Sequence, residues 1–200
     1  AVPVIRDVEL RHTGTFNLGG KWLPFTSVQH VTTARPGFVW DARVQMMPGL
    51  VAHVHDAYVN GRGDLTARVG GLIPVMHMEG ADIDDGEFLR WCAESAWYPT
   101  VLLPACGAEW KPRSDTSAEL TLRDGDRSAT LTATFGPDGL LNTIRVEKRG
   151  RAVDGVIIPT PWEGRWERYE RRDGVLVPTK GEVAWITENG YEPYWRGEAR

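Results

Sequence analysis

The stretch VAHVHDAYV at residues 51–59, followed by NGRG at residues 60–63, decides the fold. Its side chains alternate between two sides of an extended chain, with a period of two residues rather than the 3.6 residues of a helix. The Asn-Gly pair supplies the positive φ angles that a tight hairpin turn needs. The stretch therefore predicts a β-strand and a hairpin, and residues 64–72 resume the extended pattern.

The same alternation, interrupted by glycine turns, recurs along most of the chain. Short turns every eight to twelve residues favour a sandwich, barrel or half-barrel over an α/β fold. We expect a single domain at residues 1–200, mainly β, with an antiparallel curved sheet or half-barrel of about ten strands. Besides residues 51–59 and 64–72, the expected strands are 9–17, 22–33, 38–46, 118–122, 128–135, 140–148, 162–172, 175–178, 182–187 and 194–199.

One segment breaks this alternation and predicts a short helix at about residues 84–97. Asp84 and Glu87 have the spacing of a capping box. Phe88 and Trp91 then fall on one helical face, and Pro99 ends the segment because proline disfavours helical geometry in the residue before it. We expect the helix to pack Phe88 and Trp91 on the concave face of the sheet.

Charge and composition exclude several classes of protein. The net charge of −4 gives no basic footprint for nucleic acid and argues against docking on an anionic membrane. The chain has no run of eighteen apolar residues, so no membrane-spanning helix is predicted. The pattern of the first residues predicts a strand rather than a signal peptide. Cys92 and Cys106 form no disulfide framework. We expect a soluble protein of the bacterial cytoplasm.

Nine tryptophans stand out against an otherwise ordinary composition. Each buries a large ring and carries an N–H group that needs a partner. The rings either fill a core or line a pocket for an apolar ligand. The candidate ligand-binding residues are Trp40, Phe88, Trp91, Trp97, Trp162 and Trp166.

Histidines and carboxylates are the candidates for chemistry. His53 and His55 share one face of a strand, a spacing that can chelate a metal, and His77 on another strand could converge with them. The alternative is that these histidines are solvent-facing. No cofactor is predicted, since the chain has no phosphate-binding loop, dinucleotide fingerprint or HExxH motif.

A catalytic set is a second possibility for the same histidines. Glu94 lies among aromatic residues of the expected helix, where burial could raise the pKa of its carboxyl, although pairing with Arg90 one turn earlier would serve structure instead. His53 or His55 could act as a general base beside it, helped by Asp56 or Tyr58.

Several short motifs together resemble the bacterial domain-of-unknown-function family 6544. The resemblance covers nearly the whole chain and implies an uncharacterised protein with a half-barrel similar to lipoprotein carriers of the LolA/LolB type, which hold acyl chains. His53, His55 and His77 depart from the family pattern. The motifs are WLPF at 22–25, PGFVWDA at 36–42, DAYVNGRG at 56–63, GEFLRWCAE at 86–94, PWEG at 161–164, Tyr169, and Pro178 to Trp185.

Three functions remain open. The favoured one is binding of an apolar or amphiphilic small molecule, such as an acyl chain, terpenoid or polyketide-like compound, in a tryptophan-rich cavity. The second is an enzyme that uses general acid–base chemistry for cyclisation, isomerisation or hydrolysis in the same pocket. The third is a partner-binding domain, including a homodimer, whose exposed sheet edges pair with another chain.

Overall fold

A computed structural model describes residues 4–153 and 156–200 of the chain. Within this part, thirteen strands form one antiparallel sheet in the order β6-β5-β4-β3-β2-β1-β13-β12-β11-β10-β9-β8-β7. The elements are β1 (Asp7–Leu18), β2 (Lys21–Thr32), β3 (Gly37–Met47), β4 (Leu50–Val59), β5 (Arg62–Val69), β6 (Ile73–Glu79), α1 (Ala81–Ala93), β7 (Glu109–Ser114), β8 (Ser117–Asp124), β9 (Arg127–Phe135), β10 (Leu141–Val153), β11 (Val156–Arg172), β12 (Val175–Thr187) and β13 (Gly190–Ala199). Three short 3₁₀ turns, Ser95–Trp97, Pro99–Leu102 and Pro104–Cys106, lie between α1 and β7.

The chain divides into two compact units. The N-terminal unit comprises Ala1–Trp91 and Trp195–Arg200, and the C-terminal unit comprises Cys92–Tyr194. Strand β13 and helix α1 each contribute residues to both units. The two units are described separately below, and the single domain expected from the sequence stays a prediction.

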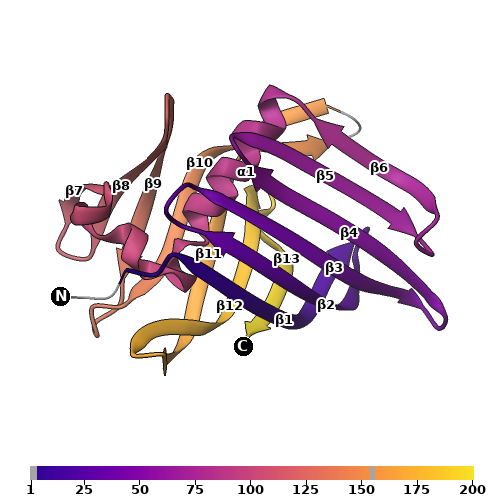
Figure 1. Ribbon diagram of the computed structural model, residues 1–200, viewed down its shortest axis with the longest axis horizontal. Helices are drawn as coiled ribbons and strands as arrows, with labels where there is room; N and C mark the ends of the chain where they lie inside the picture. Colours follow the sequence, from indigo (N-terminus) through magenta and orange to yellow (C-terminus); the bar gives the residue numbers. More distant parts are fainter. Residues whose placement is uncertain (1–3, 154–155) are drawn as a thin grey trace. The chain divides into compact units, whose positions relative to one another are not determined.

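The sheet of the N-terminal unit, strands β1 to β6 in Figure 1, has one apolar and one polar face. On β3, Phe38, Trp40 and Val44 are buried, while the intervening Asp41 and Arg43 are exposed. Antiparallel pairing continues this division across the sheet, since Trp40 lies opposite Asp56 of β4 and Asp41 opposite His55. The alternation read from the sequence is therefore confirmed as a two-faced sheet.

Helix α1 lies on the apolar face of the N-terminal unit, and its bounds differ from the expected 84–97. It begins at Ala81 and ends at Ala93, and a separate 3₁₀ turn occupies Ser95–Trp97. Asp84 lies within the first turn, where its carboxylate accepts a hydrogen bond from the backbone N–H of Gly63 at 2.8 Å. The capping-box interpretation was therefore wrong, because this carboxylate joins the helix to β5 instead.

Gly63 allows the helix to approach β5 closely. A Cβ atom at this position would lie only 2.7 Å from the carbonyl oxygen of Ile83, which is a backbone atom and cannot rotate away. The glycine after the Asn-Gly turn thus serves helix packing as well as the hairpin.

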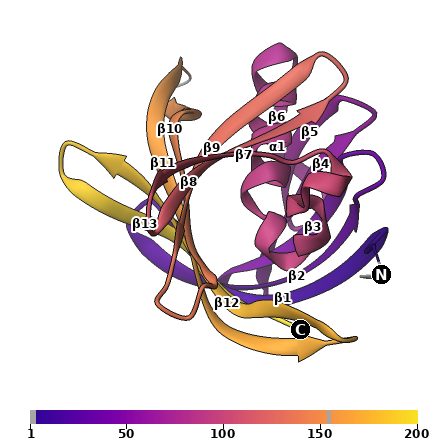
Figure 2. The same ribbon diagram turned by 90° about the vertical axis from the view of Figure 1, so that its left-hand side faces the viewer.

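The C-terminal unit contains β7 to β12 and the first residues of β13, and its long hairpin β11–β12 can be followed in Figure 2. Trp162 and Trp166 of β11 are buried on one face, while Arg165 and Glu167 are exposed on the other. Arg168 takes a positive φ of 56°, and the pairing skips this residue between Glu167 and Tyr169.

The expectation of about ten strands was too low. Residues 109–114, where no strand was expected, form β7, and the expected strands at 175–178 and 182–187 are one strand, β12. Strands β6 and β7 end the sheet and carry Pro74 and Pro112. Proline is tolerated at an edge because no neighbour needs its missing N–H, yet it weakens the strand pattern in the sequence. No helix of the described residues is long and apolar enough to span a membrane.

Candidate functional site

A buried ion pair fixes α1 to the sheet. The Arg90 guanidinium donates to the Asp56 carboxylate on β4, and the two side chains are only 14% and 10% exposed. The guanidinium carbon also lies 4.7 Å from the ring centre of Phe38 and 4.9 Å from that of Trp40. Pairing of Arg90 with Glu94 on its own helix stays a prediction, and the contact with Asp56 on the sheet was not foreseen.

Aromatic contacts surround this pair. The rings of Phe88 and Tyr58 lie 5.7 Å apart, and the Trp91 indole N–H donates to the Thr32 carbonyl at 3.1 Å. The expectation that Phe88 and Trp91 pack against the sheet is confirmed. Trp40, Phe88 and Trp91 are each at most 4% exposed, so they belong to the core beneath the helix.

The contacts of α1 fall at one end of the apolar face. They involve the cross-strand rows Phe38–Tyr58–Gly63 and Trp40–Asp56–Leu65, together with Thr32. The next two rows toward the β3–β4 turn are apolar from β3 to β6, and we call these four-strand segments the open rows. They are Ala42–Val54–Ala67–Met76 and Val44–Ala52–Val69–Ile73.

The open rows are only partly shielded from solvent. Val54 and Val69 are half-buried, whereas Ile73 and Met76 are exposed. Met78, which pairs with Leu65 on the same face, is also half-buried. This face therefore offers an apolar surface beyond the end of the helix.

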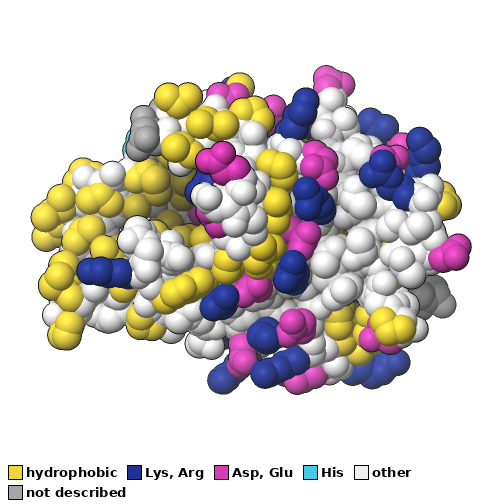
Figure 3. Space-filling model, turned by 180° about the vertical axis from the view of Figure 1, so that it is seen from behind, with side chains coloured by type: hydrophobic (Ala, Val, Ile, Leu, Met, Phe, Trp, Pro, Cys, Tyr) yellow, Lys and Arg dark blue, Asp and Glu magenta, His cyan; other side chains and the backbone are white. Residues whose placement is uncertain are grey.

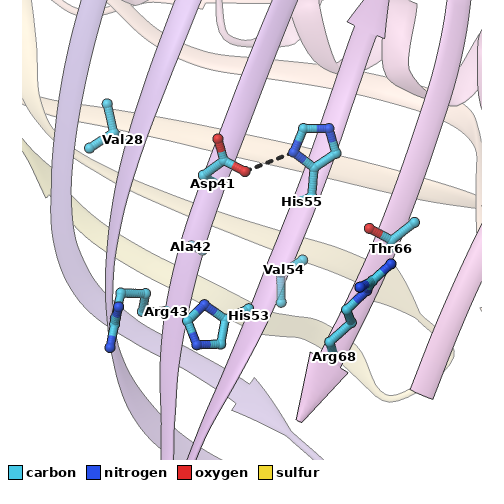
Figure 4. A pocket seen from close by; sticks show the side chains of 9 residues that line it. All are labelled: Val28, Asp41, Ala42, Arg43, His53, Val54, His55, Thr66 and Arg68. Atoms are coloured by element: carbon cyan, nitrogen blue, oxygen red, sulfur yellow. Dashed lines mark hydrogen bonds and ion pairs between the residues drawn. The ribbon is translucent and has the colours of Figure 1, made fainter. Parts of the chain in front are cut away.

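The candidate histidines lie on the opposite, polar face. His55 Nδ1 is 2.7 Å from a carboxylate oxygen of Asp41, and His53 lies two residues away on the same strand (Figure 4). They line a groove of about 500 Å³ together with Arg43, Thr66 and Arg68. Asp56 and Tyr58, by contrast, are buried on the apolar face. The four catalytic candidates of the N-terminal unit are thus divided between two faces of one sheet.

The proposed metal ligands share the polar face but are not grouped. His77 of β6 pairs with Thr66 and lies 3.9 Å from Glu79. Among residues 4–153 and 156–200, no three His, Cys, Asp or Glu side chains are arranged to hold a metal ion.

The remaining aromatic candidates form a buried cluster in the C-terminal unit. Trp97 and Trp166 meet edge to face with ring centres 4.8 Å apart. The Trp162 indole N–H donates to the Tyr194 hydroxyl at 2.9 Å, and Arg149 lies 5.0 Å from the Trp162 ring centre. These tryptophans are at most 4% exposed and serve as core residues of this unit.

Glu94 and Cys92 also belong to the C-terminal unit. Glu94 is half-buried and its carbonyl accepts the N–H of Trp97 at 3.0 Å. Cys92 is buried, and burial, with a smaller contribution from Asp124, raises the pKa of its thiol well above the ordinary value. A thiol in that state is a poor nucleophile.

Sequence reasoning missed the open rows and the basic side chains of the groove. The alternation places Val54 and Met76 on the side of their strands that faces away from the histidine side chains. It places Ala67 on the corresponding side of the strand between them. The alignment of these strands into apolar rows follows from register, which no single strand reveals.

The solved structures that are similar to this chain include two with low sequence identity. One is a LolA superfamily protein from Nitrosomonas europaea, with 10% identity and a TM-score of 0.46, covering 97% of this chain and 83% of that one. The other is a DUF1329 family protein from Desulfovibrio piger, with 11% identity and a TM-score of 0.48, covering 98% of this chain and 84% of that one. At these values neither similarity carries an argument about function. No curated protein matches the chain.

A family model matches the chain, but it describes a different family from the one that the short motifs resemble. Membership of family 6544 is not confirmed. The expectation that the chain belongs to an uncharacterised family is confirmed. The match extends over residues 1–200. The chain therefore belongs to DUF6920, a family of unknown function.

Proposed function

We propose that the protein binds an apolar or amphiphilic small molecule, such as an acyl chain, terpenoid or polyketide-like compound, on the open rows of the N-terminal unit. The supporting observation is that α1 is fixed to one end of an apolar sheet face, while the two rows beyond it remain partly accessible. An exposed apolar surface beside a rigid element is typical of ligand-binding sites.

The site differs from the tryptophan-rich cavity expected from the sequence. Trp40 lies in the row next to the open rows and is covered by Arg90. Aliphatic and methionine side chains would make the contacts instead. Methionine suits ligands of variable shape, because its unbranched side chain adapts to irregular surfaces.

Two adjacent residues of β6 provide a matched test. Met76 belongs to an open row, whereas the next residue, His77, pairs with Thr66 on the polar face. Both positions are exposed, so a carboxylate at either one is compatible with the fold. We expect Met76→Asp to weaken palmitate binding at least tenfold, because the ligand would desolvate the new charge. His77→Asp should change it less than twofold.

Isothermal titration calorimetry against palmitate, a diterpene and a naphthalene sulfonate dye would make this measurement. Absence of saturable binding to every member of the panel would remove the proposal. Equal losses in Met76→Asp and His77→Asp would place the ligand elsewhere.

A further inference from the structure

Exposed apolar side chains mark one end of the N-terminal sheet. The β1–β2, β3–β4 and β5–β6 turns lie at this end, because the strands are consecutive and antiparallel. Leu18 is 40% exposed, Met47 58% and Leu72 85%. Hydrophobic side chains gather at the left of Figure 3, which corresponds to the right of Figure 1, where the β3–β4 and β5–β6 turns lie. We call these three residues the apolar tips.

Acidic residues are absent from the sequence around the tips. No Asp or Glu occurs between Glu9 and Asp41, between Asp41 and Asp56, or between Asp64 and Glu79. These intervals contain all three turns. Although the whole chain has a net charge of −4, the sequence around these three turns contains no negatively charged residue.

A basic row crosses the polar face near the same end. Arg43 lies opposite His53, and His53 lies opposite Arg68. Among the described residues, no carboxylate forms an ion pair with Arg43 or Arg68. The nearby carboxylate of Asp41 pairs with His55. Arg43 and Arg68 lie two strands apart on either side of His53, so the row brings two cationic side chains together at a place that favours an external anion.

The spacing of tips and basic row fits a lipid surface. Arg43 and Met47 are three paired positions apart on β3, about 10 Å along the strand, because the pairing shifts by one residue between Gln45 and Met47. Leu72 lies in the turn after Val69, the last residue of β5. Apolar side chains of interfacial proteins enter a bilayer by about 5–10 Å. The row would then lie roughly 0–5 Å above the hydrocarbon, within a headgroup layer about 5–8 Å thick.

We propose that this end of the N-terminal unit docks on an anionic phospholipid surface, with the apolar tips inserted and the lipid phosphates bound by the row Arg43–His53–Arg68. The charge complementarity of the row selects a phosphate-bearing surface over a neutral apolar partner. The proposal does not rest on ligand binding by the open rows, since neither the tips nor the basic row belongs to them. It also replaces the expectation, drawn from total charge, that the chain avoids anionic membranes.

Vesicle sedimentation tests the proposal. The full chain should sediment with vesicles of equal parts phosphatidylglycerol and phosphatidylcholine, and much less with pure phosphatidylcholine. Met47→Ser/Leu72→Ser should weaken binding roughly 100-fold, because it removes the inserted methylene groups. Arg43→Gln/Arg68→Gln should weaken it about 30-fold, since each arginine contributes about fivefold near an anionic surface.

Matched controls come from the C-terminal unit. Val156→Ser/Ile158→Ser changes exposed apolar residues, and Arg171→Gln/Arg172→Gln changes exposed arginines. Both should bind within twofold of the original chain, and circular dichroism confirms that each variant is folded. Inorganic phosphate and glycerol 3-phosphate should compete weakly, because they lack the bilayer into which the tips insert.

Three results would overturn the proposal. The first is no sedimentation with the anionic vesicles. The second is equal binding to anionic and neutral vesicles. The third is a dimer in light scattering that Met47→Ser/Leu72→Ser converts to a monomer without any vesicle binding, which would assign the tips to a second copy of the chain.

Discussion

The Arg90–Asp56 pair provides a quantitative test of how α1 is held. Asp56→Ala leaves a guanidinium with only 14% of its side chain exposed and without this carboxylate. Breaking a buried pair from one side costs up to about 3–5 kcal/mol, because a poorly solvated charge loses a counter-charge. Arg90→Met keeps much of the side-chain volume but strands the Asp56 carboxylate, and should cost a similar amount.

The double variant Asp56→Ala/Arg90→Met should be destabilised by far less than the sum of the two single changes. It removes both charges and loses mainly the stacking of Arg90 on Phe38 and Trp40, worth about 1–2 kcal/mol. We therefore expect a coupling free energy of at least about 2 kcal/mol. Urea unfolding of the four proteins, followed by tryptophan fluorescence, measures it.

The exposed pair Lys180–Glu167, whose charged atoms lie 2.7 Å apart, is the matched control. Its coupling free energy should stay below about 1 kcal/mol, because solvent screens both charges. If Asp56 and Arg90 proved additive to within about 0.5 kcal/mol, the pair would not fix the helix and the reasoning would fail.

Three further predictions concern single sites. Gly63→Ala should cost about 1–3 kcal/mol in the free energy of unfolding, because its Cβ would lie 2.7 Å from a backbone oxygen of α1; a stability unchanged in urea melts would show that the helix shifts freely. A thiol-specific chromophore should react with one cysteine of the folded chain, the exposed Cys106, and with two in denaturant, since burial raises the pKa of Cys92; two rapid reactions in the folded state would contradict that burial. Tyr169→Phe should cost about 1 kcal/mol through the lost 2.6 Å hydrogen bond to a carbonyl of β10. Burial also raises the pKa of the Tyr169 hydroxyl above its ordinary value of 10.0. This tyrosine therefore stabilises the fold fully below about pH 10, and its contribution declines as pH rises through the higher pKa of the folded state. An ultraviolet titration in which Tyr169→Phe lost no late-ionising component would argue against the raised pKa.

The sequence predicts the strand-rich fold because period-two alternation and glycine turns are local signals. Residues 51–59 were placed within one residue of β4, and the turn at 60–63 agrees with the positive φ of Asn60. The edge strands were harder to identify, since Pro74 and Pro112 interrupt their pattern. Half-barrel curvature was expected from the sequence and stays a prediction.

The site was less predictable because it depends on pairs distant in sequence. Arg90 has a local carboxylate in Glu94, one turn away, yet it binds Asp56, 34 residues earlier. His53 and His55 were correctly placed on one face of their strand, but the sequence does not say which sheet face the helix covers. That choice follows from Gly63, Asp84 and Arg90 acting together. The absence of acidic residues around three turns was visible in the sequence and was masked by the total charge.

The four methionines of the chain permit a direct test of the ligand-binding surface. Met76 and Met78 lie on the face of the open rows, whereas Met47 is an apolar tip and Met46 precedes it at the register shift of β3. Methyl-¹³C methionine spectra, recorded during titration with palmitate below its micelle concentration, report on all four at once. We predict saturable shifts of the Met76 and Met78 methyl signals and a smaller change at Met47. Unchanged spectra, or a shift confined to Met47, would contradict binding on the open rows.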